Sequence, residues 1–166
     1  CSACILTPKM VDVSQHENIT LLAYSEVKSV EGHVGSFKVK VVKQPRYVRE
    51  TCTACGSCSA VCPVEVPSEF EAALGNRKAI YTPFPQAVPR TYVRDAASCI
   101  KCMKCVKACP AKAVNFAQKP EEIDLEVGAI ILATGFEIFD ASRKEEYGFG
   151  VYKNVITGMQ FERLIN

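Results

Sequence analysis

Apolar and polar residues alternate along the first part of the chain, from Ile19 to Val30 and again from Ser36 to Lys43. Alternation with a period of two is typical of a strand that buries one face. The stretch from Gly32 to Gly35 separates the two segments, and its glycines favour a turn. The pattern therefore predicts a half-buried β-hairpin.

A second kind of pattern, a continuous apolar run, occurs late in the chain in VGAIILATG, which ends at Gly135. Such a run predicts a strand that is buried on both faces, and its final glycine permits a sharp exit.

A short helix is predicted over Ser68 to Leu74, with Ser68 as its N-cap and Glu71 at the capping-box position. The final residues, TGMQFERLIN, also have a helical pattern.

The middle of the chain contains an internal repeat. PRYVRE leads into Cys52 and PRTYVRD leads into Cys99, so that a short predicted strand precedes each of two cysteine runs. Two similar halves indicate a module with pseudo-twofold symmetry. The proline-rich segment between the halves is predicted to be a wrapping loop outside the core.

Composition narrows the class of protein. The chain has 166 residues, 48% of them hydrophobic, and a formal charge of +2, which suits a soluble globular protein and not a disordered or nucleic-acid-binding one. Eight of its ten cysteines lie in two short runs without a leader before them, so a reducing, cytoplasmic location is expected. The longest apolar stretch, Val127 to Ala133, is far shorter than the roughly 20 residues of a membrane-spanning helix.

Both cysteine runs, CTACGSCSAVCP and CIKCMKCVKACP, have the spacing C-x2-C-x2-C-x3-C-P. This spacing binds [4Fe–4S] clusters in two-cluster ferredoxins, where the fourth cysteine of each run ligates the other cluster. Three thiolates on a tight loop can reach three irons, while the fourth, one helical turn further on, points away from its own loop. The predicted ligand sets are Cys52, Cys55, Cys58 and Cys109 for one cluster, and Cys99, Cys102, Cys105 and Cys62 for the other.

A pair of structural zinc sites is a weaker interpretation of the two cysteine runs. Structural zinc sites usually combine two separated C-x2-C pairs, often with histidine, and the runs fit that pattern poorly.

Cys1 and Cys4 form a further C-x2-C pair, which either contributes to an additional [4Fe–4S] cluster with ligands from elsewhere or consists of free thiols. His16 and His33 have no evident partner and are expected at the surface. No catalytic acid, base or nucleophile is indicated.

Four segments carry a resemblance to a known family: CILTPKMVDV, SEVKSVEGHVGSFKVK, RKAIYTPFPQAVP and EVGAIILATGFE. Together with the two cysteine runs, they closely resemble the iron–sulfur flavoprotein (A) component of heterodisulfide reductase from methanogens and related anaerobes, over essentially the whole chain. The chain begins without methionine and stops within a predicted helix, so it is expected to be an internal piece of such a protein.

The resemblance implies an α+β fold in which a ferredoxin-like module with two [4Fe–4S] clusters is inserted into the β-meander and returning strand of a thioredoxin-reductase-like FAD-binding domain. The expected divisions are residues 1–44 for part of the flavoprotein domain, 45–117 for the inserted module, and 118–166 for the return to the flavoprotein. By the same resemblance, Ala133, Thr134 and Gly135 would line the flavin site. The glycine-rich FAD fingerprint is not present and is expected upstream of Cys1.

The function that this resemblance implies is single-electron relay between [4Fe–4S] clusters and FAD within an oxidoreductase. The complex would reduce a heterodisulfide and, by flavin-based electron bifurcation, a ferredoxin. The implied partners are the other heterodisulfide reductase subunits, a hydrogenase or formate dehydrogenase, and a soluble ferredoxin. The alternatives are a free dicluster ferredoxin, which would not need the flanking strands, and a zinc-dependent interaction module.

The two cysteine runs differ in charge. The first has no basic residue between Cys52 and Cys62, whereas the second contains Lys101, Lys104 and Lys107, followed by Lys112. Positive charge near a cluster favours its reduced form. The sequence therefore predicts the higher reduction potential at the second run, with an effect limited by solvent screening if these lysines are exposed.

Overall fold

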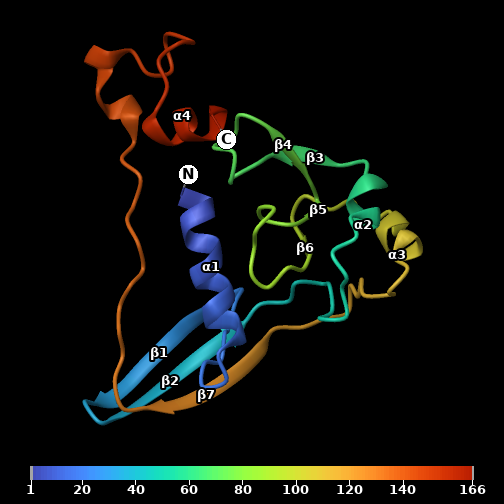
Figure 1. Cartoon of the computed structure of the whole chain (residues 1–166). Coiled ribbons are helices and arrows are strands. Elements are labelled where there is room, and N and C mark those ends of the chain that lie inside the picture. Colours follow the sequence, from blue (N-terminus) through green and yellow to red (C-terminus); the bar gives the residue numbers. More distant parts are fainter. Residues whose placement is uncertain (1, 166) are drawn as a thin grey trace.

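A computed structural model describes residues 2–165, with side chains from residue 5 onward. It contains an antiparallel sheet, a cysteine-rich region built from short elements, and a terminal segment on either side (Figure 1). The N-terminal segment is a helix that sequence patterning did not predict, α1 (Ser2–Gln15), which includes Pro8. Among residues 2–165, no helix combines the length and the apolar character that crossing a membrane requires.

The sheet has three strands, β1 (Ser25–His33), β2 (Ser36–Lys43) and β7 (Glu121–Val127), in the order β1-β2-β7. The predicted hairpin is confirmed as β1 and β2, which are antiparallel. Its first strand starts at Ser25 and not at Ile19, because Tyr24 has a left-handed φ of 61° and because Ser25 already pairs with Lys43, the last residue of β2. Gly32 is required at the end of β1, since a Cβ there would collide with the carbonyl oxygen of Ser36.

The cysteine-rich region consists of two short helices and two small antiparallel ladders. The helices are α2 (Ser57–Ala60) and α3 (Lys104–Ala108), which pack against each other. The ladders join β3 (Glu65–Pro67) to β4 (Asn76–Lys78), and β5 (Ile80–Tyr81) to β6 (Val93–Arg94). The short strands predicted before the cysteine runs are confirmed as β6 and as a bridge between Val48 and Val114.

Two predictions for the segment between the cysteine runs are wrong. Ser68 to Leu74 forms turns and not a helix, since Ala72 and Ala73 have left-handed φ angles of 49° and 61°. The Ser68 hydroxyl still accepts a hydrogen bond from the backbone N–H of Glu71, at 3.4 Å. The segment is also not merely a wrapping loop, because Ile80 is among the most deeply buried side chains of the core, with 2% of its surface exposed.

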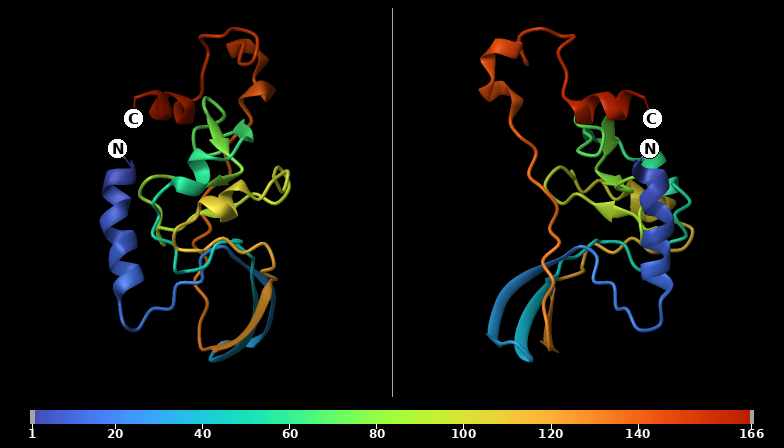
Figure 2. Two further views of the ribbon diagram at one scale, coloured as in Figure 1. Left: turned by 90° about the vertical axis from the view of Figure 1, so that its right-hand side faces the viewer. Right: turned by 60° about the vertical axis from the view of Figure 1, so that its left-hand side comes forward.

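The cysteine-rich region leaves the sheet and returns to it at adjacent positions. Lys43, at the end of β2, pairs with Glu121, at the start of β7. Further along, the backbone N–H of Asn115 donates to the carbonyl of Tyr47 at 2.8 Å, so the entering and leaving segments run antiparallel. Two views from other sides also place this region beside one end of the sheet (Figure 2).

The apolar run after β7 differs from its prediction. It was expected to be a strand buried on both faces, but Ile131 and Leu132 are 90% and 84% exposed, and residues 129–140 form no strand. A buried strand needs hydrogen-bonding neighbours, and no other strand of the described chain pairs with this run. It leads from the sheet to the C-terminal segment as a long extended stretch (Figure 1).

The C-terminal segment contains two 3-10 turns (Ala141–Arg143 and Glu145–Tyr147) and the helix α4 (Gly158–Leu164). The predicted C-terminal helix is therefore confirmed. It starts with a capping box in which the Thr157 side chain and the Gln160 side chain each bond to the other's backbone N–H. The guanidinium of Arg163 lies 4.5 Å from the ring centre of Phe70, which connects α4 to the turn between β3 and β4.

Candidate metal centres

Two cavities in the cysteine-rich region are each lined by four thiols. The cysteines of the first cavity are Cys52, Cys55, Cys58 and Cys109. Those of the second are Cys62, Cys99, Cys102 and Cys105. The two cavities are narrow and similar in size, and all eight thiols are free. Each cavity therefore combines three cysteines of one run with the last cysteine of the other, which are the sets that the spacing predicted.

The two cysteine loops share an unusual backbone conformation. In the first loop Ala54 and Gly56 have φ angles of 54° and 83°, and in the second Lys101 and Met103, at the equivalent positions, have 55° and 60°. Left-handed angles are uncommon for residues other than glycine and often mark functional loops. The alternation curls each loop so that its three thiols face one cavity.

Backbone N–H groups also point at thiol sulfurs in matching positions. The N–H of Ala54 donates to Cys52 Sγ, and the N–H of Lys101 donates to Cys99 Sγ, both at 3.4 Å. The two halves of the repeat therefore position the sulfur of their first cysteine by the same backbone hydrogen bond.

The short helices separate the third and fourth cysteines of each run. Cys58 and Cys105 lie within α2 and α3 and are buried, each with 7% exposure. Cys62 and Cys109 follow four residues later, beyond the helix ends, where they line the cavity of the opposite run. One helical turn therefore carries the chain from one cavity to the other.

Burial and neighbouring thiols affect the ionisation of the buried cysteine in each cavity. Burial, reinforced by the neighbouring Cys52 and Cys109, raises the pKa of Cys58 to about 11. Burial also raises the pKa of Cys105, with a contribution from its neighbours Cys99 and Cys102. Four such thiols can all ionise together only if positive charge lies between them. This donor set fits a cationic metal centre, and tetrathiolate ligation is the chemistry of [4Fe–4S] clusters.

Cys55 behaves differently because it lies at the exposed rim of the first cavity. A hydrogen bond with Ser57 lowers the pKa of Cys55. Within residues 2–165, no three cysteine, histidine or acidic side chains converge as closely as ligands of a single metal ion do. The thiols instead lie around the walls of the two cavities.

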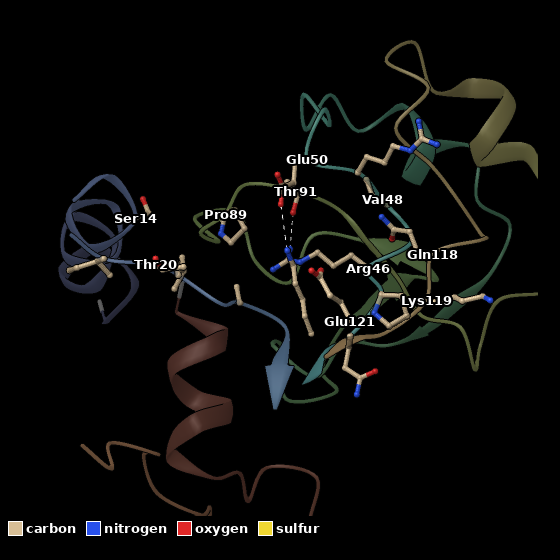
Figure 3. Close-up of a pocket in the computed structure, with 17 residues that line it drawn as sticks. Ser14, Thr20, Arg46, Val48, Glu50, Pro89, Thr91, Gln118, Lys119 and Glu121 are labelled. Atoms are coloured by element: carbon tan, nitrogen blue, oxygen red, sulfur yellow. Dashed lines mark hydrogen bonds and ion pairs between the residues drawn. The ribbon is translucent and has the colours of Figure 1, made fainter. Parts of the chain in front are cut away.

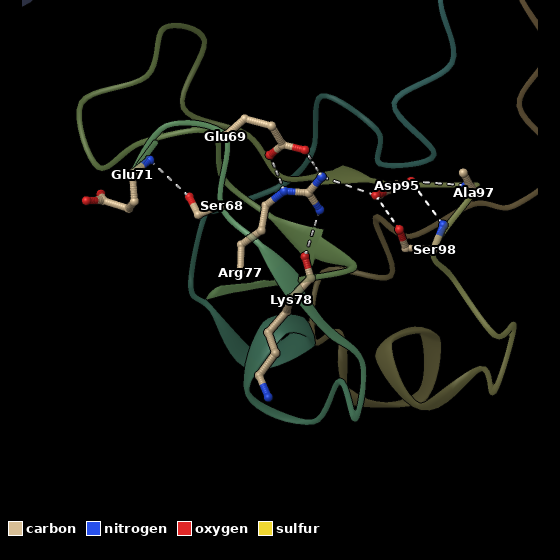
Figure 4. A network of polar contacts seen from close by, with 8 residues as sticks. All are labelled: Ser68, Glu69, Glu71, Arg77, Lys78, Asp95, Ala97 and Ser98. Carbon is tan, nitrogen blue, oxygen red and sulfur yellow. Dashed lines mark hydrogen bonds and ion pairs between the residues drawn. The ribbon is translucent and has the colours of Figure 1, made fainter. Parts of the chain in front are cut away.

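A network of polar side chains holds the start of the second cysteine run (Figure 4). The Asp95 carboxylate accepts hydrogen bonds from the backbone N–H groups of Ala97 and Ser98 at 3.0 and 3.2 Å, and from the Ser98 hydroxyl at 2.8 Å. Arg77 of β4 donates to Asp95 at 3.1 Å and binds Glu69 through two nitrogens. The turn that precedes Cys99 is thus fixed to β4.

The wall of the second cavity also contains an arginine that sequence reasoning missed. Arg94 is only 4% exposed, and its guanidinium lies between the rings of Phe116, at 4.0 Å, and Tyr47, at 4.6 Å. The repeat could have revealed it, because Arg94 stands where Arg49 stands in the first half. The first cavity has the uncharged Tyr92 in its wall.

A wide cleft, of about 780 Å³, lies where the cysteine-rich region meets the sheet (Figure 3). Arg46 lies in its wall and donates a hydrogen bond to the Thr91 hydroxyl at 2.7 Å. Burial lowers the pKa of Arg46, although Tyr24 and Glu50 counteract part of the effect. None of the eight cysteines of the two runs lines this cleft.

The remaining predicted site residues lie apart from the two cavities. Ala133, Thr134 and Gly135 are exposed in the extended segment, and Gly135 has a φ of 78°. Cys1 lies outside the described residues, and Cys4 belongs to α1 with its side chain undescribed. Both histidines are exposed, as predicted, and so are the lysines between the cysteines of the second run.

Comparison with known proteins identifies the domain to which the cysteine region belongs. Residues 51–114 match the family described as 4Fe-4S dicluster domain. These residues include all eight cysteines of the two cavities. The zinc interpretation is therefore wrong, and the cofactors that this domain carries are two iron–sulfur clusters.

Longer relatives match the flanks as well. The iron-sulfur A component of the CoB--CoM heterodisulfide reductase of Methanocaldococcus jannaschii is 58% identical over 167 residues, which cover 100% of this chain and 25% of that protein. The chain is homologous over its whole length to the A component of heterodisulfide reductase. The A component of the H(2):CoB-CoM heterodisulfide,ferredoxin reductase of Methanothermobacter marburgensis is 54% identical, with the same coverage.

A third relative is the A component of the Ferredoxin:CoB-CoM heterodisulfide reductase of Methanosarcina mazei, which is 52% identical over 168 residues and of which the chain covers 21%. The chain thus spans about a quarter of the length of the curated relatives it matches. Since the similarity to these relatives includes the sheet and the terminal segments, the cysteine module occurs in them together with its flanks. A free dicluster ferredoxin would not need them.

Proposed function

We propose that this chain is an electron-relay segment of the A component of a heterodisulfide reductase, in which each cysteine cavity holds one [4Fe–4S] cluster with crossed ligation. The observation that carries the proposal is the composition of the cavity walls, where three thiols of one run meet the fourth thiol of the other. When bound, each cluster accepts and releases single electrons.

The protein's own residues have three roles in this relay. The eight thiolates bind the iron, and the N–H groups of Ala54 and Lys101 position the sulfur of the first cysteine of each loop. Apolar residues around the cavities, such as Val48, Ile80 and Val114, exclude water from the metal centres. Packing of α2 against α3 brings the two cavities together, which short-range electron transfer requires.

We further infer that residues 45–117 are a module inserted into a FAD-binding flavoprotein domain to which residues 1–44 and 118–166 belong. The pairing of Lys43 with Glu121 supports an insertion, because the module begins and ends at neighbouring strands. In the longer protein, Ala133, Thr134 and Gly135 would lie beside the flavin. The exposed Ile131 and Leu132 would then be covered by the rest of that domain.

The longer protein would act as one component of an oxidoreductase that reduces a heterodisulfide, coupled by flavin-based bifurcation to reduction of a ferredoxin. Its partners would be the other heterodisulfide reductase subunits, a hydrogenase or formate dehydrogenase, and a soluble ferredoxin. The names of the relatives support this assignment, since they include hydrogen-dependent and ferredoxin-dependent heterodisulfide reductases.

The proposal is tested by cluster ligation in the anaerobically purified full-length protein. Iron analysis should find about eight iron atoms for the two proposed clusters, in addition to any bound elsewhere in the longer chain. Cys62→Ser should perturb only the paramagnetic resonance signal of the cluster held by Cys99, Cys102 and Cys105. Cys109→Ser is the matched variant and should perturb only the other cluster of the module. If each variant instead damages the cluster of its own run, the crossed assignment is wrong.

A further inference from the structure

Arg94 is a buried cation without an anionic partner among the described residues. It is 4% exposed, forms no ion pair there, and its Nε is buried without a hydrogen-bond acceptor. Its guanidinium contacts two aromatic faces, which attract a cation but do not neutralise it. Arginine stays protonated inside proteins, so this charge has to be compensated.

The carboxylates near Arg94 are already used. Asp95, the next residue, is bonded to Arg77 and to the turn before Cys99. Glu26 lines an outer cleft that Arg94 also borders, but its carboxylate forms an ion pair with Lys28 at 2.6 Å. The remaining candidate is the second cavity, whose wall Arg94 shares with four thiols.

The first half of the repeat lacks an equivalent charge. Arg49, the counterpart of Arg94, is exposed and lines the cleft at the junction with the sheet. The aromatic residue at the first cavity is Tyr92, whose phenol carries no positive charge, and no lysine or arginine among the described residues lines that cavity. The two otherwise similar cavities therefore differ by one buried positive charge.

We propose that Arg94 is the buried counter-charge of the cluster in the second cavity and makes that cluster the easier of the two to reduce. This inference rests on the cluster ligation proposed above. A one-electron donor, such as a reduced flavin or dithionite, adds one electron and no proton, so the cluster and its thiolates become one unit more negative. A fixed cation in a poorly solvated wall favours that more negative state.

Burial decides which positive charges have the largest effect on the potential of the second cluster. The lysines between the cysteines of the second run are exposed, so water and salt screen them from the cluster. Arg94 is shielded from water by Tyr47 and Phe116, so its effect on the cluster persists at high salt. Arg94 is therefore the larger contribution to the difference between the two clusters, and the lysines are the smaller one.

The test is a redox titration of the full-length protein, followed by paramagnetic resonance, on three variants. Arg94→Gln removes the charge, Arg94→Lys keeps it, and Arg49→Gln is the matched control at the exposed position of the repeat. Arg94→Gln should lower the reduced-to-oxidised ratio of the second cluster about tenfold at a given potential, which is about 59 mV for a one-electron couple. Arg94→Lys should change it by less than a third of that, and Arg49→Gln should leave both clusters unchanged.

The outcomes separate this inference from the proposed function. If the unmodified protein binds no cluster in the second cavity, the ligation proposal fails. If both clusters are present and Arg94→Gln leaves their potentials unchanged, or if Arg94→Lys shifts the second cluster as much as Arg94→Gln, only the counter-charge is refuted. If the Arg94→Gln variant does not assemble its clusters, the Arg94→Lys variant decides. Both clusters bound there, with little change in the potential of the second, would support the counter-charge. Loss of the clusters from Arg94→Lys would overturn it.

Discussion

Replacing Asp95 by alanine tests whether the second cysteine run is held in place by its polar network. The carboxylate accepts three hydrogen bonds within its own turn and one from Arg77. A typical hydrogen bond contributes a net ~0.5–1.5 kcal/mol, but the Asp95 side chain is 19% exposed and some freed donors can bind water. The expected loss is therefore about 2 kcal/mol of the free energy that holds this turn closed.

The charge state of Asp95 supports this estimate at neutral pH. Burial raises the pKa of Asp95, but hydrogen bonds from Ser98 and Arg77 outweigh that effect, so its pKa lies below the ordinary value. A carboxylate with a depressed pKa stabilises the fold above the unfolded value of about 3.9, and the contribution is lost as pH falls through the folded value. The assay is therefore performed near pH 7, where the full contribution is present.

The measurement is the anaerobic bleaching rate of the clusters in a fixed concentration of guanidinium. If cluster loss follows the population of the opened turn, about 2 kcal/mol corresponds to roughly 30-fold faster bleaching of the second cluster. The matched control is Glu50→Ala, at the equivalent position of the first repeat. Its side chain is 94% exposed and has one ion pair, with Lys43 at 3.6 Å, so the rate should change by less than about threefold.

Equal bleaching rates in the Asp95→Ala and Glu50→Ala variants would refute the reasoning. Asp95→Asn adds a further comparison, because it keeps one acceptor oxygen but removes the charge. Its rate should lie between those of the native protein and Asp95→Ala. A rate equal to that of Asp95→Ala would mean that charge, and not hydrogen-bond geometry, is what holds the turn.

Two further predictions concern the module and its surface. Residues 45–117 expressed alone should bind both clusters, because Lys43 and Glu121, just outside the two ends, are paired in the sheet and so hold the ends close together. Iron content measures this, and failure where the full-length protein succeeds would count against an inserted domain. Changing Lys101, Lys104 and Lys107 together to glutamine should lower the reduction potential of the second cluster only, and by less than Arg94→Gln does. The same change should weaken the dependence of the electron-transfer rate to an acidic partner on salt concentration. Unchanged potential and salt dependence would contradict the role of these lysines.

Local sequence patterns predicted several elements correctly. The hairpin followed from alternation around Gly32, and the C-terminal helix from its periodicity, since both signals depend on neighbouring residues. The same local reasoning failed for Ser68 to Leu74. Its capping hydrogen bond forms, but Ala72 and Ala73 adopt left-handed angles, and the segment instead turns between the paired strands β3 and β4. Tertiary pairing overrode helix propensity there.

The apolar run ending at Gly135 shows the limit of pattern reasoning in another way. Its composition predicts burial, but burial depends on neighbours, and beyond Val127, which ends β7, none of the described strands pairs with the run. Ile131 is consequently 90% exposed. Whether an apolar segment forms a strand depends on what is available to hydrogen-bond with its backbone.

The sequence by itself determined the chemistry of the two centres, because the spacing of thiols along a short loop limits which cofactor they can bind and the repeat indicates two sites. It also indicated which fourth cysteine would cross over, since the fourth cysteine of each run lies beyond a short helix, away from the loop that holds the other three. The sequence also showed that the second run carries more lysines, but only the tertiary structure revealed a buried charge at one of the two centres. Arg94 and Arg49 occupy the same position of the repeat, yet one is buried between Tyr47 and Phe116 and the other is exposed. Burial depends on contacts between residues distant in sequence, and it controls how strongly a charge acts on its surroundings.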